Sequence, residues 1–266
     1  MKKVLTIAGS DPSGGAGIQA DLKTMTCLGV YGMSAITALT AQNTTGVYGV
    51  MEATPDFVSL QLDCIFQDIR PDAVKIGMVS NGDIIRAIAA KLREYKARNV
   101  VVDPVMVATS GSSLMQEGAV AALTGELFPL AAVITPNIPE AERLCGFAIE
   151  GEEDMLRAAR AIAPSVAGGV LIKGGHLTDT ADDLLWLDGQ AHWYRSPRVD
   201  NPNNHGSGCT LSSAIASFLA LGCDLPTAVG KAKAYITAAM EAGLDLGAGS
   251  GPLKHNYAVP EGGAVQ

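Results

Sequence analysis

The sequence predicts an α/β protein with a doubly wound, mostly parallel sheet flanked by helices and a β-hairpin late in the chain. Six short apolar runs recur along the 266 residues, and amphipathic stretches such as residues 81–97 separate most of them. Strands that alternate with helices form parallel sheets. The runs are continuously apolar, as expected for strands covered on both faces. A composition of 48% hydrophobic but only 5% aromatic residues indicates an aliphatic core, more typical of an α/β enzyme than of a β-sandwich.

The expected strands are, in chain order, residues 3–8, 33–39, 72–77, 99–104, 131–136 and 168–173. Residues 182–187 and 190–195 are expected to form the hairpin, because Asp188-Gly189 suits the left-handed conformations of a two-residue turn. Two closing helices are expected over residues 207–221 and 226–242. The chain has no internal repeat and no long linker, so we expect a single domain over residues 1–266, with the tail beyond about residue 256 loosely ordered.

Charge and composition exclude several classes of function. The net charge of -8 and the lack of any basic run argue against a nucleic-acid surface. No uninterrupted apolar stretch is long enough to span a bilayer, and the first strand meets Gly9 too early for a signal peptide. We therefore expect a cytoplasmic protein. Its five cysteines are scattered, odd in number and without a Cys-x-x-Cys pair, which fits reduced thiols better than disulfides or a zinc site.

Residues 201–216, NPNNHGSGCTLSSAIA, place two glycines and a cysteine at the start of an apolar helix. Gly206 and Gly208 let backbone amides converge, and the helix N-terminus adds unpaired N–H groups and a positive dipole, which together suit a phosphoryl group. The same field would lower the pKa of the Cys209 thiol, so Cys209 is a candidate base. The alternative is ordinary helix capping by Ser207 or Thr210, with Cys209 as a small buried residue. The motif alone leaves both interpretations open.

Polar residues follow several of the predicted strands, where ligands bind in open parallel sheets. Gly9 to Asp11, Asp103, Thr135 to Asn137 and Lys173 stand at such strand ends and could share one cleft. The loop Gly9 to Gly17 has the glycine density of a phosphate cradle but neither the Walker nor the dinucleotide spacing. Its alternative is a tight turn before the first helix.

Each of the remaining candidates has a structural alternative. Asn137 and Glu140 have the spacing of a capping box, which spacing alone favours. Asp103 suits either a turn before proline or Mg²⁺ held through water. Lys173 suits a surface or the neutralisation of phosphates. Gln42 could begin a turn, or its amide could pair with an amino group beside a ring nitrogen.

Seven ordered segments, from Lys3 to about His255, closely resemble the hydroxymethylpyrimidine and hydroxymethylpyrimidine-phosphate kinases of thiamine synthesis. They are TIAGSDPSGGAGIQADLKT, TALTAQNTTGV, KIGMV, VVDPVM, ITPNIPEAE, IKGGH and NNHGSGCTLSSAIA. The resemblance implies a ribokinase-like fold, ATP and Mg²⁺ as cofactors, and a homodimer. It also implies two successive phosphorylations, first of 4-amino-5-hydroxymethyl-2-methylpyrimidine and then of its monophosphate.

The resemblance also implies a role for each matched residue. It makes Cys209 the base and forms the anion hole from Gly206, Ser207 and Gly208. It assigns the aminopyrimidine edge to Gln42, and the ring and hydroxymethyl group to Gly9, Asp21, Met78 and Val105. It assigns the ATP phosphates to Asn137 and Lys173, and magnesium, held through waters, to Asp103 and Glu140.

Two positions depart from the family pattern, which usually has threonine where this chain has Asn204 and Ser207. Ser207 keeps the hydroxyl and the backbone amide, whereas Asn204 has no consequence that the sequence can assign. Two rival functions stay open: a pyridoxine or pyridoxal kinase, and a non-catalytic pyrimidine- or nucleotide-binding sensor. The pair Gln42-Asn43 favours the pyrimidine, and the joint presence of Cys209, Asp103, Glu140 and Lys173 favours catalysis.

Overall fold

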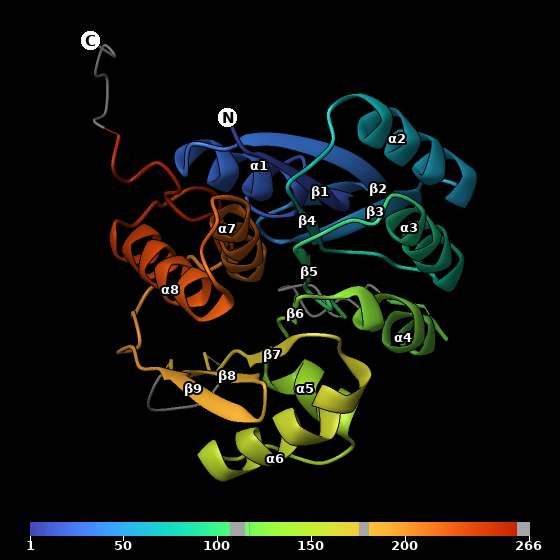
Figure 1. Ribbon diagram of the computed structural model, residues 1–266. Coiled ribbons are helices and arrows are strands. Elements are labelled where there is room, and N and C mark those ends of the chain that lie inside the picture. The colour runs from blue at the N-terminus through green and yellow to red at the C-terminus, as the bar shows by residue number, and fades with distance from the viewer. Residues whose placement is uncertain (107–114, 117, 176–180, 260–266) are drawn as a thin grey trace.

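Figure 1 shows the computed structural model of the protein, which describes residues 1–106, 115, 116, 118–175 and 181–259. The last part of the tail that the sequence predicts to be loosely ordered, residues 260–266, lies outside the described residues. In this part of the chain nine strands form one sheet, in the order β3-β2-β1-β4-β5-β6-β7-β8-β9. The strands are β1 (Lys3–Ser10), β2 (Tyr31–Asn43), β3 (Gly46–Glu52), β4 (Ala73–Ile76), β5 (Val100–Val102), β6 (Val133–Ile134), β7 (Gly169–Ile172), β8 (Asp183–Leu187) and β9 (Gln190–Tyr194).

The six strands from β2 to β7 in the sheet order run parallel, while β3, β8 and β9 are antiparallel to their neighbours. The predicted doubly wound, mostly parallel sheet is therefore confirmed. The late hairpin is also confirmed, because β8 and β9 are joined at Asp188 and Gly189, whose φ angles are 50° and 77°. Left-handed values at both positions fit the primed turns that match strand twist.

Helices cover both faces of the sheet (Figure 1). They are α1 (Gly17–Cys27), α2 (Pro55–Asp68), α3 (Gly82–Glu94), α4 (Ala119–Ala122), α5 (Ile138–Cys145), α6 (Glu152–Ile162), α7 (Ser207–Ala220) and α8 (Leu225–Glu241), with a π-helical turn at Leu123–Leu127 and short 3₁₀ turns at Phe128–Leu130 and Ala163–Ser165. Leu5 and Val74 pack in the larger apolar core with α2 to α6, whereas the neighbouring Val4 and Ala73 pack in the second core with α1, α7 and α8. Alternate side chains of each strand thus serve opposite faces, which explains the continuous apolar runs.

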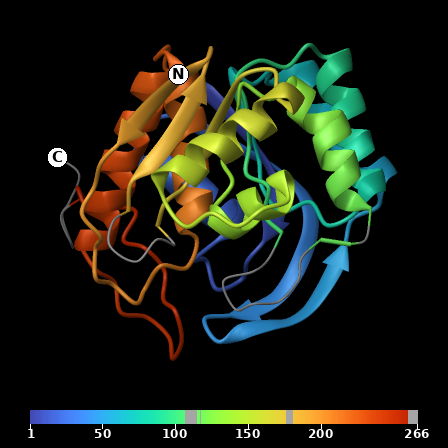
Figure 2. The ribbon, with the colours of Figure 1, turned by 90° about the horizontal axis from the view of Figure 1, so that it is seen from below.

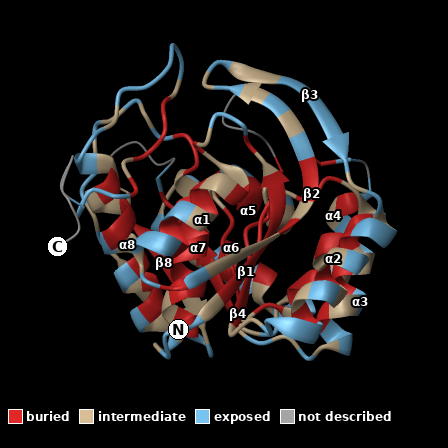
Figure 3. Cartoon of the chain, turned by 90° about the horizontal axis from the view of Figure 1, so that it is seen from above, coloured by how far each residue is buried: buried red, intermediate tan, exposed pale blue. Residues whose placement is uncertain are grey.

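The sequence did not predict β3. Strand β2 continues to Asn43, and β3 returns antiparallel beside it as an edge strand whose side chains are mostly exposed (Figures 2 and 3). Its sequence, GVYGVME, is apolar but short and interrupted by Gly46 and Gly49, which are more typical of a turn than of a strand. The two closing helices lie within a residue or two of their predicted bounds. None of the helices among the described residues has the length and apolarity needed to cross a bilayer.

Candidate active site

A cavity of about 810 Å³ opens at the carboxyl ends of the parallel strands and at the N-terminus of α7. Among its lining residues are nearly all of those singled out from the sequence: Gly9, Gln42, Met78, Asp103, Val105, Asn137, Glu140, Lys173, Gly206, Ser207, Gly208 and Cys209. The single cleft expected at the strand ends is thus present. Its volume is in the range of small-molecule sites.

Helix α7 begins at this cavity, where Gly206, Ser207, Gly208 and Cys209 are lining residues. Gly206 has φ 81°, and a Cβ built on it would lie 1.9 Å from the carbonyl oxygen of Gly15, so the close approach of the two loops needs glycine. No side chain of the described residues caps the helix. The N–H of Ser207 donates to the backbone carbonyl of Asn204 at 3.1 Å, a contact that any residue at position 204 could make. The Asn204 side chain in turn accepts from Ser250 at 3.0 Å.

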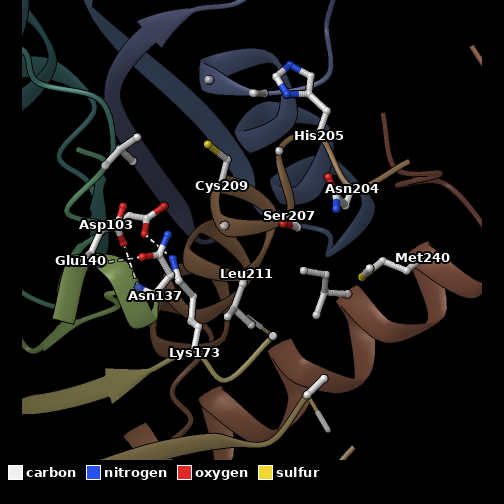
Figure 4. A pocket seen from close by; sticks show the side chains of 18 of the residues that line it. Asp103, Asn137, Glu140, Lys173, Asn204, His205, Ser207, Cys209, Leu211 and Met240 are labelled. Carbon is white, nitrogen blue, oxygen red and sulfur yellow. Dashed lines mark hydrogen bonds and ion pairs between the residues drawn. The ribbon is translucent and has the colours of Figure 1, made fainter. Parts of the chain in front are cut away.

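The lowered pKa expected for the Cys209 thiol is wrong. Cys209 lies half-buried at the cavity wall (Figure 4), and burial raises the pKa of its thiol to about 11. The positive charge of Lys75 and a hydrogen bond with the backbone of Gly17 lower this pKa, while Asp21 and Asp103 raise it. Loss of water around the sulfur outweighs the lowering by Lys75 and Gly17. At neutral pH the thiol of the free protein is protonated.

Asp21 does not line the cavity, contrary to the role that the resemblance implied. Its carboxylate is fully buried and accepts both contacts from Lys75 Nζ, at 2.9 Å to Oδ1 and 2.8 Å to Oδ2. Thr6 Oγ1 donates to the same carboxylate at 2.6 Å. Lys75 is itself 0% exposed, so the pair lies beneath the site. It acts on Cys209 through its charges rather than by touching a ligand in the cavity.

Asp103, Glu140 and Lys173 form one charged group beside α7 (Figure 4). Lys173 Nζ contacts Asp103 Oδ1 at 2.9 Å, and Thr135 donates to the same oxygen at 2.9 Å. A Cβ on Gly208 would lie 3.3 Å from both Asp103 Oδ2 and Lys173 Nζ, so the helix start lies against this pair. Burial raises the pKa of Glu140, whereas for Asp103 the cations Lys173 and Lys75 overcome burial and lower the pKa.

The charged group of Asp103, Glu140 and Lys173 offers a metal ion two carboxylates, those of Asp103 and Glu140. The described residues hold no cluster of three or more His, Cys, Asp or Glu side chains in metal-binding range. Mg²⁺ keeps several waters and is usually held by one or two carboxylates together with phosphates, so Asp103 and Glu140 fit it as a water-mediated ligand pair. Asp103 Oδ2 makes no hydrogen bond in the described part of the chain and faces Gly208.

Asn137 forms the capping box that its spacing predicts. Its side chain accepts from the Glu140 N–H at 2.9 Å, and Glu140 Oε2 accepts from the Asn137 N–H at 2.8 Å. The end of β6 lies beside the end of β7, since Lys173 N–H donates to the Pro136 carbonyl at 2.9 Å. Asn137 and Lys173 therefore reach the cavity from adjacent strand ends, and Asn137 also begins α5.

Sequence reasoning missed two residues of the site, Lys75 and His205. His205 is 7% exposed, lines the cavity next to Gly206, and places Nε2 2.8 Å from Asp11 Oδ2 and 3.3 Å from Gln42 Nε2. A histidine directly before the Gly206 turn was the available signal. Lys75 stands within an otherwise apolar strand run, where a charge always needs a partner.

Parallel strand ends, a glycine-rich helix N-terminus and a buried lysine–carboxylate group around one cavity define a class of protein: enzymes that transfer a phosphoryl group to a small molecule. The chain belongs to the phosphomethylpyrimidine kinase family, whose model matches residues 11–254.

Relatives agree with this assignment over nearly the whole chain. A thiamine biosynthesis bifunctional protein of Geobacter sulfurreducens is 55% identical over 97% of this chain, which spans 53% of that longer protein. A hydroxymethylpyrimidine/phosphomethylpyrimidine kinase of Rhizobium meliloti is 54% identical over 94% of this chain and 96% of its own length. The solved ADP complex of a Bacillus subtilis pyridoxal kinase is 40% identical, with a TM-score of 0.90 over 97% of this chain and 98% of that one. The expected ribokinase-like fold and kinase family are confirmed.

Proposed function

We propose that this chain transfers a phosphoryl group from ATP to the hydroxymethyl group of 4-amino-5-hydroxymethyl-2-methylpyrimidine, and then a second one to the resulting monophosphate, for thiamine biosynthesis. The observation that carries the proposal is the single cavity that brings Gln42 together with the α7 N-terminus and the Asp103–Lys173 pair. One end offers a paired donor and acceptor for an aminopyrimidine, and the other offers positive charge for phosphates.

Phosphoryl transfer depends mainly on alignment and on neutralising the charge that spreads over the transferred oxygens. The α7 amides and Lys173 would hold that charge, and Asn137 would orient the phosphates of ATP. Mg²⁺, held through waters by Asp103 and Glu140, would supply further positive charge when bound.

Cys209 would accept the hydroxyl proton late in the transfer. A loose transition state keeps the attacking hydroxyl protonated until the bond to phosphorus is nearly formed, so the demand on the base is small. The buried Lys75 beneath the sulfur favours the thiolate that this step needs, because its charge lowers the thiol pKa. Lys75 therefore supports the base without touching the substrate, and Asp21 holds Lys75 in place although its own charge raises the thiol pKa.

We further propose that the enzyme is a cytoplasmic homodimer. The edge strand β3 exposes large apolar side chains, with Tyr48 70%, Val50 48% and Met51 64% exposed. A second copy packed on this hairpin would cover them. Reduced conditions suit the five free cysteines. Light scattering should show a dimer, and a monomeric mass at micromolar concentration would contradict the assembly proposal.

Product analysis by mass spectrometry tests the activity directly. Purified protein incubated with the pyrimidine alcohol, ATP and Mg²⁺ should form the monophosphate and then the diphosphate. A higher kcat/KM for pyridoxine than for the pyrimidine would favour the vitamin B6 kinase instead. Binding of the pyrimidine without any consumption of ATP would favour the sensor.

A further inference from the structure

Three side chains from distant parts of the sequence meet at one wall of the cavity. Asp11 follows β1, Gln42 lies near the end of β2, and His205 precedes α7. His205 Nε2 lies 2.8 Å from Asp11 Oδ2 and 3.3 Å from Gln42 Nε2. The same ring nitrogen thus stands between a carboxylate and an amide.

Asp11 determines which role the His205 nitrogen plays. Its carboxylate already accepts hydrogen bonds from Ser13 N and Ser13 Oγ at 2.9 and 2.7 Å and from Ala16 N at 2.9 Å. Although burial raises it, the hydrogen bonds of His205, Ser13 and Ala16 bring the pKa of Asp11 down to about 2. An ionised carboxylate only accepts hydrogen bonds, so His205 Nε2 carries a hydrogen and donates it.

That assignment constrains the Gln42 amide. The single hydrogen of His205 Nε2 points to Asp11, the closer partner, and a second N–H from the Gln42 NH₂ group would be repelled by it. The favourable orientation of the amide therefore turns Oε1 toward His205, where it shares this hydrogen as a second and weaker acceptor. At its other end the amide lies 3.2 Å from Thr40 Oγ1, whose own hydrogen goes to the Ser10 carbonyl at 2.9 Å. Thr40 Oγ1 then accepts from the amide nitrogen, so both ends of the amide favour the same orientation.

The imidazole is held firmly enough to impose this order. His205 is 7% exposed, and its backbone N–H donates to the Gly251 carbonyl at 3.1 Å. A Cβ on Gly15 would lie 2.4 Å from His205 Cδ2, so the ring packs directly on the glycine-rich loop. With one lone pair of Oε1 and one hydrogen of the NH₂ group engaged, the Gln42 amide offers its remaining acceptor and donor in a fixed order.

We propose that the Asp11–His205 pair is a specificity-determining device that locks the Gln42 amide in one orientation, so that the site accepts a ring edge with an amino donor beside an acceptor nitrogen. It rejects an edge in which donor and acceptor are exchanged. The inference rests on the proposed function for the identity of the ring. His205 and Asp11 act through Gln42 and are positioning residues.

The test compares two pyrimidine alcohols that differ at one position. The 4-amino compound presents an amino donor beside the acceptor N3, whereas its 4-oxo counterpart presents a carbonyl acceptor beside N3–H. Isothermal titration calorimetry gives the ratio of their dissociation constants for each protein. We expect His205→Phe to reduce the preference for the amino compound at least about tenfold, the scale of one hydrogen bond, and to change ATP binding less than twofold.

Matched variants separate positioning from general damage. His205→Gln, which can place an amide N–H where the imidazole Nε2 stands, should restore most of the preference. His192→Phe makes the same chemical change on β9, outside the cavity lining, and should leave the ratio unchanged. In a Gln42→Ala background, His205→Phe should have no further effect on the ratio, because its route is gone.

An unchanged ratio in folded His205→Phe, or an equal further loss in the Gln42→Ala background, would overturn the inference. If His205→Phe does not fold, His205→Gln and Asp11→Asn give the same comparison, and a full preference retained in Asp11→Asn would count against the device. Turnover of the wild-type protein tests the kinase function separately. A wild type that binds the amino compound selectively but transfers no phosphate would refute the kinase proposal alone.

Discussion

From the buried ion pair beneath the site we predict how much Lys75→Met lowers the free energy of unfolding. Lys75 and Asp21 are both 0% exposed, and Lys75 Nζ holds both carboxylate oxygens at 2.8 and 2.9 Å. Methionine fills the same volume without the charge. It leaves Asp21 with neutral partners, the hydrogen bond from Thr6 at 2.6 Å and one from Ser213, and with no positive charge in contact with its oxygens among the described residues.

The expected loss in unfolding free energy is about 3–5 kcal/mol, the cost of leaving one buried charge without its partner. That is a large part of the 5–15 kcal/mol typical of a whole protein of this kind. The double variant Lys75→Met with Asp21→Asn should recover at least half of the loss, because the uncompensated carboxylate is gone. The penalty therefore comes from the stranded charge and not from missing contacts of the lysine.

Guanidinium unfolding followed by circular dichroism at pH 7.5 measures both values. Lys91→Met is the matched control: Lys91 also pairs with carboxylates, those of Asp63 and Glu94, but its side chain is 20% exposed. Its loss should stay below about 1 kcal/mol. A Lys75→Met loss as small as that of the control, or a double variant no more stable than the single one, would refute the reasoning.

Three further predictions follow from the site. Asp11→Asn should weaken the loss of unfolding free energy at low pH, because the folded-state pKa of Asp11 is about 2 against an ordinary 3.8, so that its contribution of about 2 kcal/mol is full above pH 4 and lost as the pH falls toward 2. Denaturant unfolding at pH 5 and pH 3 measures this loss, and an equal loss in the wild type and the variant would contradict the prediction. Cys209→Ala should lower kcat by about 10²–10⁴-fold and leave KM for ATP within twofold, and near-normal turnover would rule out Cys209 as the base. In the wild type, the rate of alkylation of Cys209 should rise from pH 8 to 11, as a thiol pKa of about 11 requires. Asn137→Ser should keep the helix cap and lower the free energy of unfolding by less than about 0.5 kcal/mol, against about 1 kcal/mol for Asn137→Ala. Both variants should raise KM for ATP in steady-state assays, and an unchanged KM would leave Asn137 only its capping role.

The parallel sheet was predictable because each strand is covered on both faces and so appears as an unbroken apolar run. The edge strand β3 has apolar residues, but its two glycines break the run, and it was missed for that reason. The positions of the strand-end residues also followed from the sequence, since parallel strands bring their carboxyl ends to one edge. Gly9, Asp103, Asn137 and Lys173 meet there as expected.

The local sequence pattern could not show which residue pairs with a buried charged side chain. Asp21 lies in a helix and Lys75 in a strand, 54 residues apart, and neither position by itself reveals a buried pair. The prediction of a lowered pKa for the Cys209 thiol failed for a similar reason. The helix start is visible in the sequence, but the burial of the sulfur and the nearby charges of Lys75, Asp21 and Asp103 arise only from the fold.

The N-terminus of α7 is assembled from both ends of the polypeptide. Its turn at Gly206 rests on the carbonyl of Gly15, residue 205 pairs with Pro252, and Thr210 meets His255 at 2.9 Å. During synthesis, therefore, most of the sheet can form on the ribosome while the contacts of the Gly206 turn are still incomplete. This wall of the cavity is therefore complete only in a chain that has closed on itself.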